Sequence, residues 1–286
     1  MLATLNEVMK IAEEKKIAIG SFNTPNLESI QAVLEAAEEL KLPVIIQFAQ
    51  CHEENMKLTV IGPVMVDMAK KAEIPVCVHL DHGETLEYLD EALKLGFTSI
   101  MYDGSTLSFE QNVDNTRKAV AMAKATGASV EAELGSMGKR ESGSGDTEGG
   151  DDTKIYTDPK LAKQFVSETG IDALACSFGT THGIYLTVPK LDFTVVERVR
   201  EECSNIPVVM HGGSGVSPED FRKAIQAGVS KVNYFTYMDK AGGSAVEEAV
   251  KGVQDGKVLF FMDVSRAAML EMKKNVKEAM KIFAGM

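Results

Sequence analysis

The stretch PVCVHLDHGETLEYLDEALKLG (75–96) contains one complete strand-then-helix unit. Residues 75–80 form a near-continuous apolar run, interrupted only by His79, which is typical of a parallel strand buried on both faces. Residues 85–96 then carry apolar side chains at helical spacing and end in a glycine, a residue that often follows a helix. Between them, LDHG (80–83) places polar side chains where the strand ends. This unit predicts an α/β fold with a parallel sheet.

The same unit recurs along the chain. Seven further runs of strand type are IAIGSFN at 17, PVIIQF at 43, SIMYDG at 99, SVEAELG at 129, ALACSFG at 173, PVVMHGG at 207 and KVNYFT at 231. Amphipathic segments of helical period, such as residues 27–40 and 217–228, lie between them. Eight units predict a (β/α)8 TIM barrel, with a doubly wound open sheet as the alternative. We expect residues 1–286 to form one such domain, with an N-terminal helix and a C-terminal helical extension within residues 256–283.

Composition limits the class of protein. A chain of 286 residues with 44% hydrophobic and 25% charged residues has the composition of a soluble globular protein. Its net charge of -12 argues against nucleic-acid and anionic-membrane partners, because both require basic surfaces. The four cysteines form no C-x-x-C pair, residues 1–16 do not resemble a signal peptide, and no apolar run is long enough to span a membrane. These features predict a protein of the reducing cytoplasm.

Polar side chains follow most of the predicted strands. In a TIM barrel the active site lies at the C-terminal ends of the strands. The residues at these positions are Asn23, Asp81, His82, Asp103, Ser105, Glu133, His182, His211, Asn233 and Thr236. Alternate residues of a strand point to opposite faces, so His79 and Asp81 should share one face and His82 should turn to the other.

Three of the five histidines occupy these strand ends: His82, His182 and His211. A lone histidine there would more often be structural, but three convergent imidazoles backed by carboxylates are typical of a metal site. Three neutral nitrogens with an open fourth position suit catalytic Zn²⁺, and also allow Co²⁺, Fe²⁺ or Mn²⁺. His79 is expected to pack against the site or support it, and His52 is expected at the surface or the rim.

Two glycine- and hydroxyl-containing segments follow the last two strands, HGGSG (211–215) and NYFT (233–236). Barrels most often bind phosphate there, because glycines let backbone N–H groups approach an oxyanion, while Ser214 and Thr236 add hydroxyl donors. The alternative is that the glycines only make tight turns. Residues 135–158, rich in Gly, Ser and acids, predict either a solvated surface loop or a lid over the site.

Together these motifs closely resemble those of the class II, metal-dependent ketose-bisphosphate aldolases, which include fructose-1,6-bisphosphate and tagatose-1,6-bisphosphate aldolases. The resemblance rests on LDHG at 80–83, MYDGS at 101–105, EAELGSMG at 131–138, FGTTHGIY at 178–185, PKLDF at 189–193, PVVMHGGSG at 207–215 and KVNYFT at 231–236. It implies a zinc-dependent aldolase that reversibly cleaves a phosphorylated ketose into dihydroxyacetone phosphate and an aldehyde. Fructose 1,6-bisphosphate is the default substrate.

The resemblance also implies a role for each site residue. The metal site would comprise the three zinc ligands and two nearby carboxylates, one of which can hold a displaced metal: His82, His182, His211, Glu133 and Asp103. The dihydroxyacetone-phosphate pocket, where a monovalent cation often also binds, would be formed by Asn23, Gly183, Gly212, Gly213, Ser214, Asn233 and Thr236. The two catalytic residues would be Asp81, which takes the C4 hydroxyl proton, and Glu141, which delivers a proton to C3 from the lid. Asp146 and Glu148 are the alternatives for the lid acid.

Three departures from the family pattern concern the phosphate contacts. Leu186 stands where many relatives have lysine, Ala49 replaces a serine common in the fructose enzymes, and MDVSRAAM (262–269) replaces a basic D-P-R stretch. They predict weak binding of fructose 1,6-bisphosphate, so tagatose 1,6-bisphosphate or another ketose 1-phosphate is the alternative substrate. A non-catalytic metal- or sugar-phosphate-binding homologue is the alternative from another class. Family members are commonly dimers or larger, so we expect a homo-oligomer, either a dimer or a tetramer.

Overall fold

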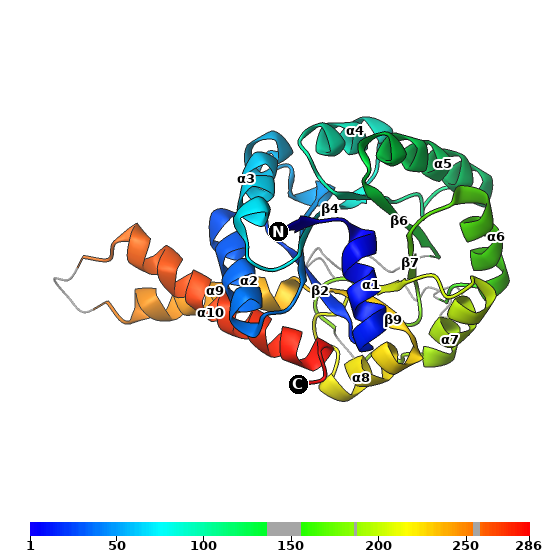
Figure 1. Ribbon diagram of the computed structural model, residues 1–286. Coiled ribbons are helices and arrows are strands. Elements are labelled where there is room, and N and C mark those ends of the chain that lie inside the picture. Colours follow the sequence, from blue (N-terminus) through cyan, green and yellow to red (C-terminus); the bar gives the residue numbers. More distant parts are fainter. Residues whose placement is uncertain (136–155, 186–187, 254–257) are drawn as a thin grey trace.

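The protein forms a closed barrel of eight parallel strands (Figure 1). The structure is a computed structural model that describes residues 1–135, 156–185, 188–253 and 258–286. The barrel strands are β2 (Ile19–Asn23), β3 (Val44–Ala49), β4 (Val76–Gly83), β5 (Ser99–Tyr102), β6 (Ser129–Leu134), β7 (Ala173–Cys176), β8 (Val208–Met210) and β9 (Val229–Asn233). The barrel closes where Ile19 of β2 pairs with Lys231 of β9. The predicted TIM barrel is therefore confirmed, and the open sheet is wrong.

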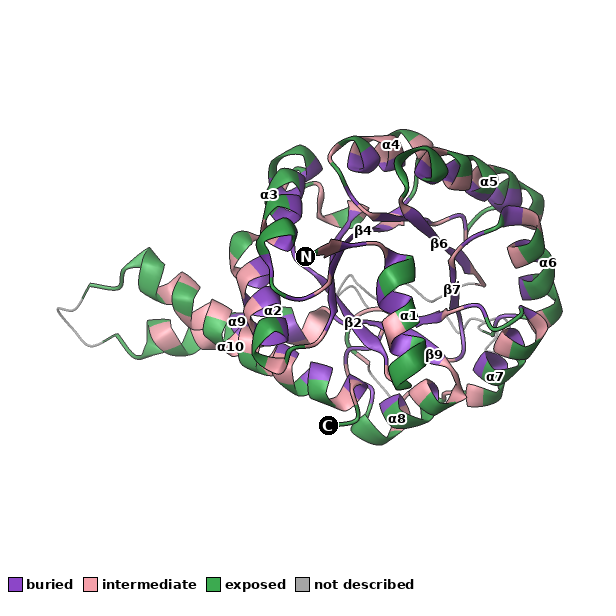
Figure 2. Cartoon of the chain, viewed as in Figure 1, coloured by how far each residue is buried: buried purple, intermediate pink, exposed green. Residues whose placement is uncertain are grey.

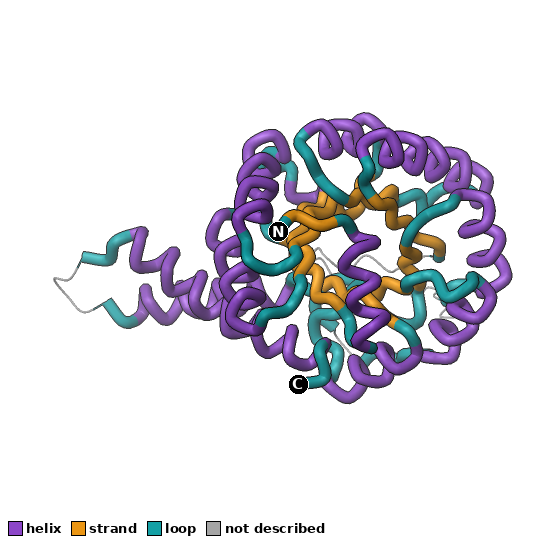
Figure 3. Tube along the Cα trace, viewed as in Figure 1, coloured by secondary structure: helices purple, strands orange, loops and turns teal. Residues whose placement is uncertain are grey.

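Each barrel strand leads into a helix on the outside of the barrel (Figure 3). These helices are α2 (Leu27–Leu40), α3 (Leu58–Lys71), α4 (Leu86–Lys94), α5 (Phe109–Thr126), α6 (Pro159–Thr169), α7 (Phe193–Glu202), α8 (Pro218–Ala227) and α9 (Thr236–Lys251). Local sequence fixes several ends. Ser217 caps α8 through the Asp220 N–H with Pro218 as the first helical residue, and Gly127 ends α5 in the left-handed conformation.

Two further elements precede β2. The two-residue strand β1 (Leu2–Ala3) pairs with the start of β4, and α1 (Leu5–Lys15) crosses the N-terminal opening of the barrel (Figure 1). Thr4 and Glu7 form a capping box at the start of α1, which fixes where the helix begins. Figure 2 shows α1 lying across this opening. Its buried residues Leu5, Val8, Met9 and Ala12 pack against the lowest layer of the barrel interior. The predicted N-terminal helix is confirmed.

The barrel interior changes from apolar to polar along the strand direction. The lower layer packs against α1 and is formed by Ile19, Ile45, Cys77, Ala173, Ala175 and Val209. The next layer consists of buried polar side chains from neighbouring strands: Ser21, Gln47, His79, Ser99, Glu131 and Lys231. The polar strand ends therefore rest on a polar support, not directly on the hydrophobic core.

The C-terminal extension pairs α9 with α10 (Phe261–Phe283), and the two helices project together from one side of the barrel (Figure 1). The second half of α10 docks on the barrel, where the backbone N–H of Ala18 donates to the Phe283 carbonyl at 3.0 Å. Its buried residues are Met272, Val276, Ala279, Met280 and Phe283. The first half is different, because Phe261 and Met262 remain 82% and 75% exposed. The predicted extension is confirmed, and its buried residues all lie from Met272 onward.

Within the described ranges, we find no helix whose length and apolar character would let it cross a membrane.

Candidate metal and substrate site

The predicted strand-end residues meet in one pocket at the C-terminal end of the barrel. Those that line it are Asn23, Asp81, His82, Asp103, Ser105, Glu133, His182, Gly183, Gly212, Gly213, Ser214, Asn233 and Thr236. His211 is fully buried, and its ring centroid lies 4.7 Å from that of His82. His52, which was expected at the surface or the rim, also lines the pocket. Its ring centroid lies 5.0 Å from that of Phe235. Glu141, Asp146, Glu148 and Leu186 lie outside the described residues.

A distortion of β4 brings His82 into this pocket. The pairing of β4 with β5 shifts register between Leu80 and Gly83, and His82 adopts a left-handed backbone conformation with φ 45°. Such a bulge re-aims side chains beside it. The expectation that His82 turns to the face opposite Asp81 is therefore wrong, since His82 Nε2 lies 3.9 Å from Asp81 Oδ1. Strict alternation fails here because the strand is not regular at its tip.

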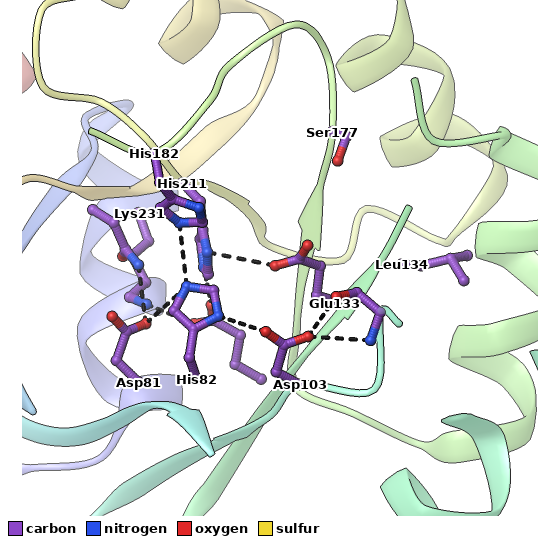
Figure 4. Close-up of polar contacts among 12 residues, drawn as sticks. Asp81, His82, Asp103, Glu133, Leu134, Ser177, His182, His211 and Lys231 are labelled. Carbon is purple, nitrogen blue, oxygen red and sulfur yellow. Dashed lines mark hydrogen bonds and ion pairs between the residues drawn. The ribbon is translucent and has the colours of Figure 1, made fainter. Parts of the chain in front are cut away.

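The three histidines present their nitrogens to one point (Figure 4). His82 Nε2 lies 3.2 Å from His182 Nε2, and the ligand atoms of all three lie within 4.8 Å of one another. His82 Nδ1 contacts Asp103 Oδ2 at 2.7 Å, and His211 Nε2 contacts Glu131 Oε1 at 2.8 Å. Because these outer nitrogens are engaged by carboxylates, His82 offers Nε2 and His211 offers Nδ1 to the centre.

Two buried polar atoms support the fit of a cation. His211 Nδ1 and Glu133 Oε2 are 3.6 Å apart, and neither has a hydrogen-bond partner within the described part of the chain. Buried polar atoms left in this way are costly unless they meet a ligand. A second group of possible ligand atoms, from His82, Asp103 and Glu133, also lies within 4.8 Å. The donor set of imidazoles and carboxylates suits a divalent transition metal.

The charges of the cluster are strongly coupled. Burial lowers the pKa of His82, but the charge of Asp81 and the hydrogen bond that His82 donates to Asp103 outweigh it and raise the pKa to about 10. Burial and the nearby Asp103 carboxylate raise the pKa of Glu133 to about 8. The carboxylates crowded here thus favour positive charge on their neighbours, which is the electrostatic character of a cation site.

Asp81 is held by three amide side chains from three strands. Its Oδ2 accepts from Asn23 Nδ2 at 3.0 Å and Gln47 Nε2 at 3.1 Å, and its Oδ1 accepts from Asn233 Nδ2 at 3.2 Å. Burial raises the pKa of Asp81, but His82 and His211 outweigh it and lower the pKa to about 2. The side chain is therefore an oriented carboxylate beside the histidine cluster.

The opposite side of the pocket is built from backbone. A Cβ atom at Gly212 would lie 2.3 Å from the Thr181 carbonyl oxygen, and this residue has φ 65°, so only glycine fits. The Ser214 hydroxyl accepts from the Phe235 N–H at 3.2 Å and from the Tyr237 N–H at 3.5 Å, and Phe235 itself supplies no side-chain cap where α9 begins at Thr236. This leaves a helix N-terminus and close backbone facing the pocket, an arrangement that favours anions.

Three residues that the strand-end pattern does not single out also support the site: Gln47, Glu131 and Tyr185. Tyr185 Oη donates to the Gly212 carbonyl at 2.8 Å and accepts from the Thr181 N–H at 3.1 Å, which joins two loops of the pocket. Gln47 and Glu131 lie two positions before Ala49 and Glu133 in their strands. Since residues two apart in a strand share one face, this spacing was the only indication in the sequence that they point into the barrel. His79 is fully buried.

Comparison with known proteins agrees with this geometry. The family model for fructose-bisphosphate aldolase class-II matches residues 3–285. The uncharacterized protein YdjI of Escherichia coli (strain K12) is 38% identical over 283 residues, covering 99% of this chain and 98% of that protein. The probable fructose-bisphosphate aldolase of Bacillus subtilis (strain 168) is 40% identical over 261 residues, covering 89% and 88%. The crystal structure of the YdjI aldolase from Escherichia coli K12 matches with a TM-score of 0.86 at 37% identity, covering 99% of this chain and 97% of that chain.

Proposed function

We propose, from the fact that this chain belongs to the class II fructose-bisphosphate aldolase family, that it is a zinc-dependent aldolase cleaving a phosphorylated ketose into dihydroxyacetone phosphate and an aldehyde. The family's enzymes are metal-dependent carbon–carbon lyases that act on sugar phosphates. The observation that carries the proposal is the juxtaposition of three convergent histidine nitrogens with the amide-bound carboxylate of Asp81.

In this proposal His82, His182 and His211 hold the metal. A divalent metal held there would supply Lewis-acid stabilisation of the ketose carbonyl and of the negative charge that develops when the C3–C4 bond breaks. Zinc suits three neutral nitrogens with an open position. Asp103 and Glu133 can share a displaced position of the metal with His82, since their ligand atoms lie within 4.8 Å.

Asp81 acts as the base for cleavage. It takes the proton of the C4 hydroxyl, C4 becomes the aldehyde carbon, and C3 keeps the bonding electrons until it takes up a proton. A general base must be correctly oriented, and the three amide contacts hold the Asp81 carboxylate in one orientation beside the histidine cluster. We assign the proton delivered to C3 to Glu141, on the family spacing alone.

The phosphate of dihydroxyacetone phosphate is placed at the backbone side of the pocket. Gly183, Gly212 and Gly213 leave room for an oxyanion to approach main-chain N–H groups, and Thr236 opens α9 beside them. The Ser214 oxygen already accepts an N–H, so its own O–H is available to donate. Asn23 and Asn233 border the same space. On the family resemblance alone, we propose that a monovalent cation also binds at this end of the pocket.

A ketose 1-phosphate with an uncharged far end is our preferred substrate over fructose or tagatose 1,6-bisphosphate. Among the described lining residues the pocket contains no lysine or arginine, while Glu84 adds a carboxylate. Ala49 leaves its position without the hydroxyl found in many fructose enzymes. A second phosphate would therefore meet repulsion and lose a donor.

A cleavage assay tests the function. The protein, stripped of metal with EDTA and reloaded with Zn²⁺, is offered a panel of ketose mono- and bisphosphates, and dihydroxyacetone phosphate is measured. We expect cleavage that EDTA abolishes and Zn²⁺ restores. Stoichiometric zinc binding without cleavage of any ketose phosphate would favour a non-catalytic binding protein.

We also propose that the protein forms a homo-oligomer. The exposed apolar side chains of Phe260, Phe261 and Met262 on the C-terminal extension support this proposal. Light scattering would test it.

A further inference from the structure

A fully buried ion pair lies in the barrel interior directly behind His211. Glu131 of β6 and Lys231 of β9 are both 0% exposed, and Lys231 Nζ lies 2.7 Å from Glu131 Oε2. The other oxygen, Glu131 Oε1, lies 2.8 Å from His211 Nε2. Figure 4 shows His211 between Lys231 on one side and Glu133 on the other. Neither Glu131 nor Lys231 lines the pocket, so neither can touch a substrate there.

Stability alone gives no reason for this pair. Removing two charges from water costs several kcal/mol, and apolar replacements of similar volume are often neutral or stabilising. The layer just below is filled by apolar residues such as Ile45 and Val209, so apolar side chains can occupy this interior. The contact with His211 is the feature that an apolar pair would lack.

We propose that Glu131 is a positioning residue that fixes the tautomer and ring orientation of His211, and that Lys231 holds Glu131 in place. A neutral histidine carries its proton on either ring nitrogen. A carboxylate at Nε2 can only accept, so the proton stays on Nε2 and the lone pair of Nδ1 points toward His82 and His182. The inference rests on the proposed metal function of His211.

Lys231 prevents Glu131 from adopting another arrangement. With one oxygen bonded to Lys231 and the other to His211, rotation of the carboxylate would break both contacts. The remaining neighbour, His79 Nε2, lies 3.6 Å from Glu131 Oε2, too far for a hydrogen bond. His79 is instead bound through Nδ1, 2.7 Å from Ser99 Oγ. Ser99 thus supports a buried histidine that is not a proposed ligand, which makes it a matched control.

The decisive variant is Glu131→Leu/Lys231→Met, which removes the acceptor and both charges together. We expect it to fold, with the metal-free protein unfolding at or above the wild-type temperature. Its zinc affinity, measured by competition with a chelator, should fall about 10–100-fold, the usual effect of losing such a supporting contact. Glu131→Gln/Lys231→Met keeps an amide oxygen for His211 and should recover part of that affinity. Ser99→Ala should bind zinc as the wild type does.

Tautomer state gives a readout independent of turnover. In protein labelled with ¹⁵N-histidine, the His211 nitrogens of the wild type should report a proton on Nε2, and Glu131→Leu/Lys231→Met should show a mixture. If this variant bound zinc with wild-type affinity and kept the Nε2–H form, the inference would be overturned. If it did not fold, Glu131→Gln/Lys231→Met would decide, because wild-type zinc affinity together with a wild-type share of the Nε2–H form in that variant would overturn the inference. Failure of the wild type to bind zinc at all would instead refute the proposed function.

Discussion

Asp81 and His82 are consecutive in the chain, yet their side chains meet, with Asp81 Oδ1 lying 3.9 Å from His82 Nε2. In a regular strand they would point to opposite faces. The left-handed backbone at His82 and the register shift before Gly83 turn both into the pocket. A proposed base and a proposed metal ligand are thereby placed side by side by one local distortion.

Removing a ligand should remove the metal. We expect His211→Ala to lose zinc and turnover together, because the other two nitrogens cannot hold the ion as tightly as three. His79→Gln, at a buried histidine outside the ligand set, serves as the control and should keep its zinc. Metal analysis that found a full complement of zinc in His211→Ala would contradict the proposed ligand set.

Replacing the proposed base should separate chemistry from metal binding. Asp81→Asn should retain zinc while turnover falls about 10²–10⁴-fold, the usual cost of losing an acid/base group. Its new amide would also face amide donors of Asn23, Gln47 and Asn233, so we expect a loss of stability of about 1–3 kcal/mol. Equal losses of zinc and activity would make Asp81 structural.

The bulge should tolerate no side chain at Gly83. A Cβ there would lie 2.3 Å from Leu89 Cδ1 and 2.9 Å from the Met101 carbonyl oxygen, so the strand tip must move. Gly83→Ala should weaken zinc binding and destabilise the fold by about 1–3 kcal/mol. Gly243→Ala, in exposed α9 with nothing within 4 Å, should stabilise by about 0.5–1 kcal/mol. Unchanged zinc affinity in Gly83→Ala would show that the bulge does not set the position of His82.

Glu84 should influence the choice of substrate. Glu84→Gln removes a carboxylate from the pocket lining and should raise kcat/KM for a ketose 1,6-bisphosphate relative to the 1-phosphate, by about two- to fivefold for an exposed charge. Raising the salt concentration should shrink this ratio, since exposed charges are screened. A ratio that did not move would place the far end of the substrate away from Glu84.

The helix α1, which covers the N-terminal opening of the barrel, should be bound to the barrel more weakly in acid. Glu13 of α1 accepts two bonds of 2.7 Å from Arg200 and one from Ser230. Burial raises the pKa of Glu13, but these hydrogen bonds outweigh it and lower the pKa. The stabilisation is therefore present above the unfolded value of about 4.3 and is lost as pH falls below it. Because the side chain is 38% exposed, Glu13→Gln should cost only about 1 kcal/mol at neutral pH.

Denaturant unfolding at pH 7 and near pH 4 measures this difference. The gap between wild type and Glu13→Gln should narrow in acid, whereas Glu14→Gln, at an exposed neighbour, should differ from wild type at neither pH. A gap that widened toward acid would reverse the sign of the linkage.

Sequence patterns predicted the barrel because each unit carries its own signals. The apolar run and helical period of residues 75–96 reappear as β4 and α4, and the polar strand ends converge because parallel strands end on the same side. Ser217 and Pro218 likewise mark the start of α8 as expected. Local information was sufficient wherever backbone geometry is regular.

The remaining features depend on contacts between distant residues. The sequence LDHG could not predict the left-handed conformation of His82, since non-glycine residues rarely adopt it. Glu131 and Lys231 are 100 positions apart, and pairing them requires the order of strands around the barrel. The alternation of side chains along a strand predicts that Glu131 points into the barrel. It does not predict which residues Glu131 contacts there.

Closure of the barrel between β2 and β9 has a consequence for the newly made chain. During synthesis, β2 leaves the ribosome long before its partner β9, which begins at Val229. The backbone contact of Ala18 forms later still, because its acceptor is Phe283 of α10. Until then the nascent protein exposes an unpaired strand edge, the kind of surface that invites misassociation. Such long-range pairing is slow to form. We therefore expect the yield of folded protein to depend on chaperones that bind exposed sheet edges.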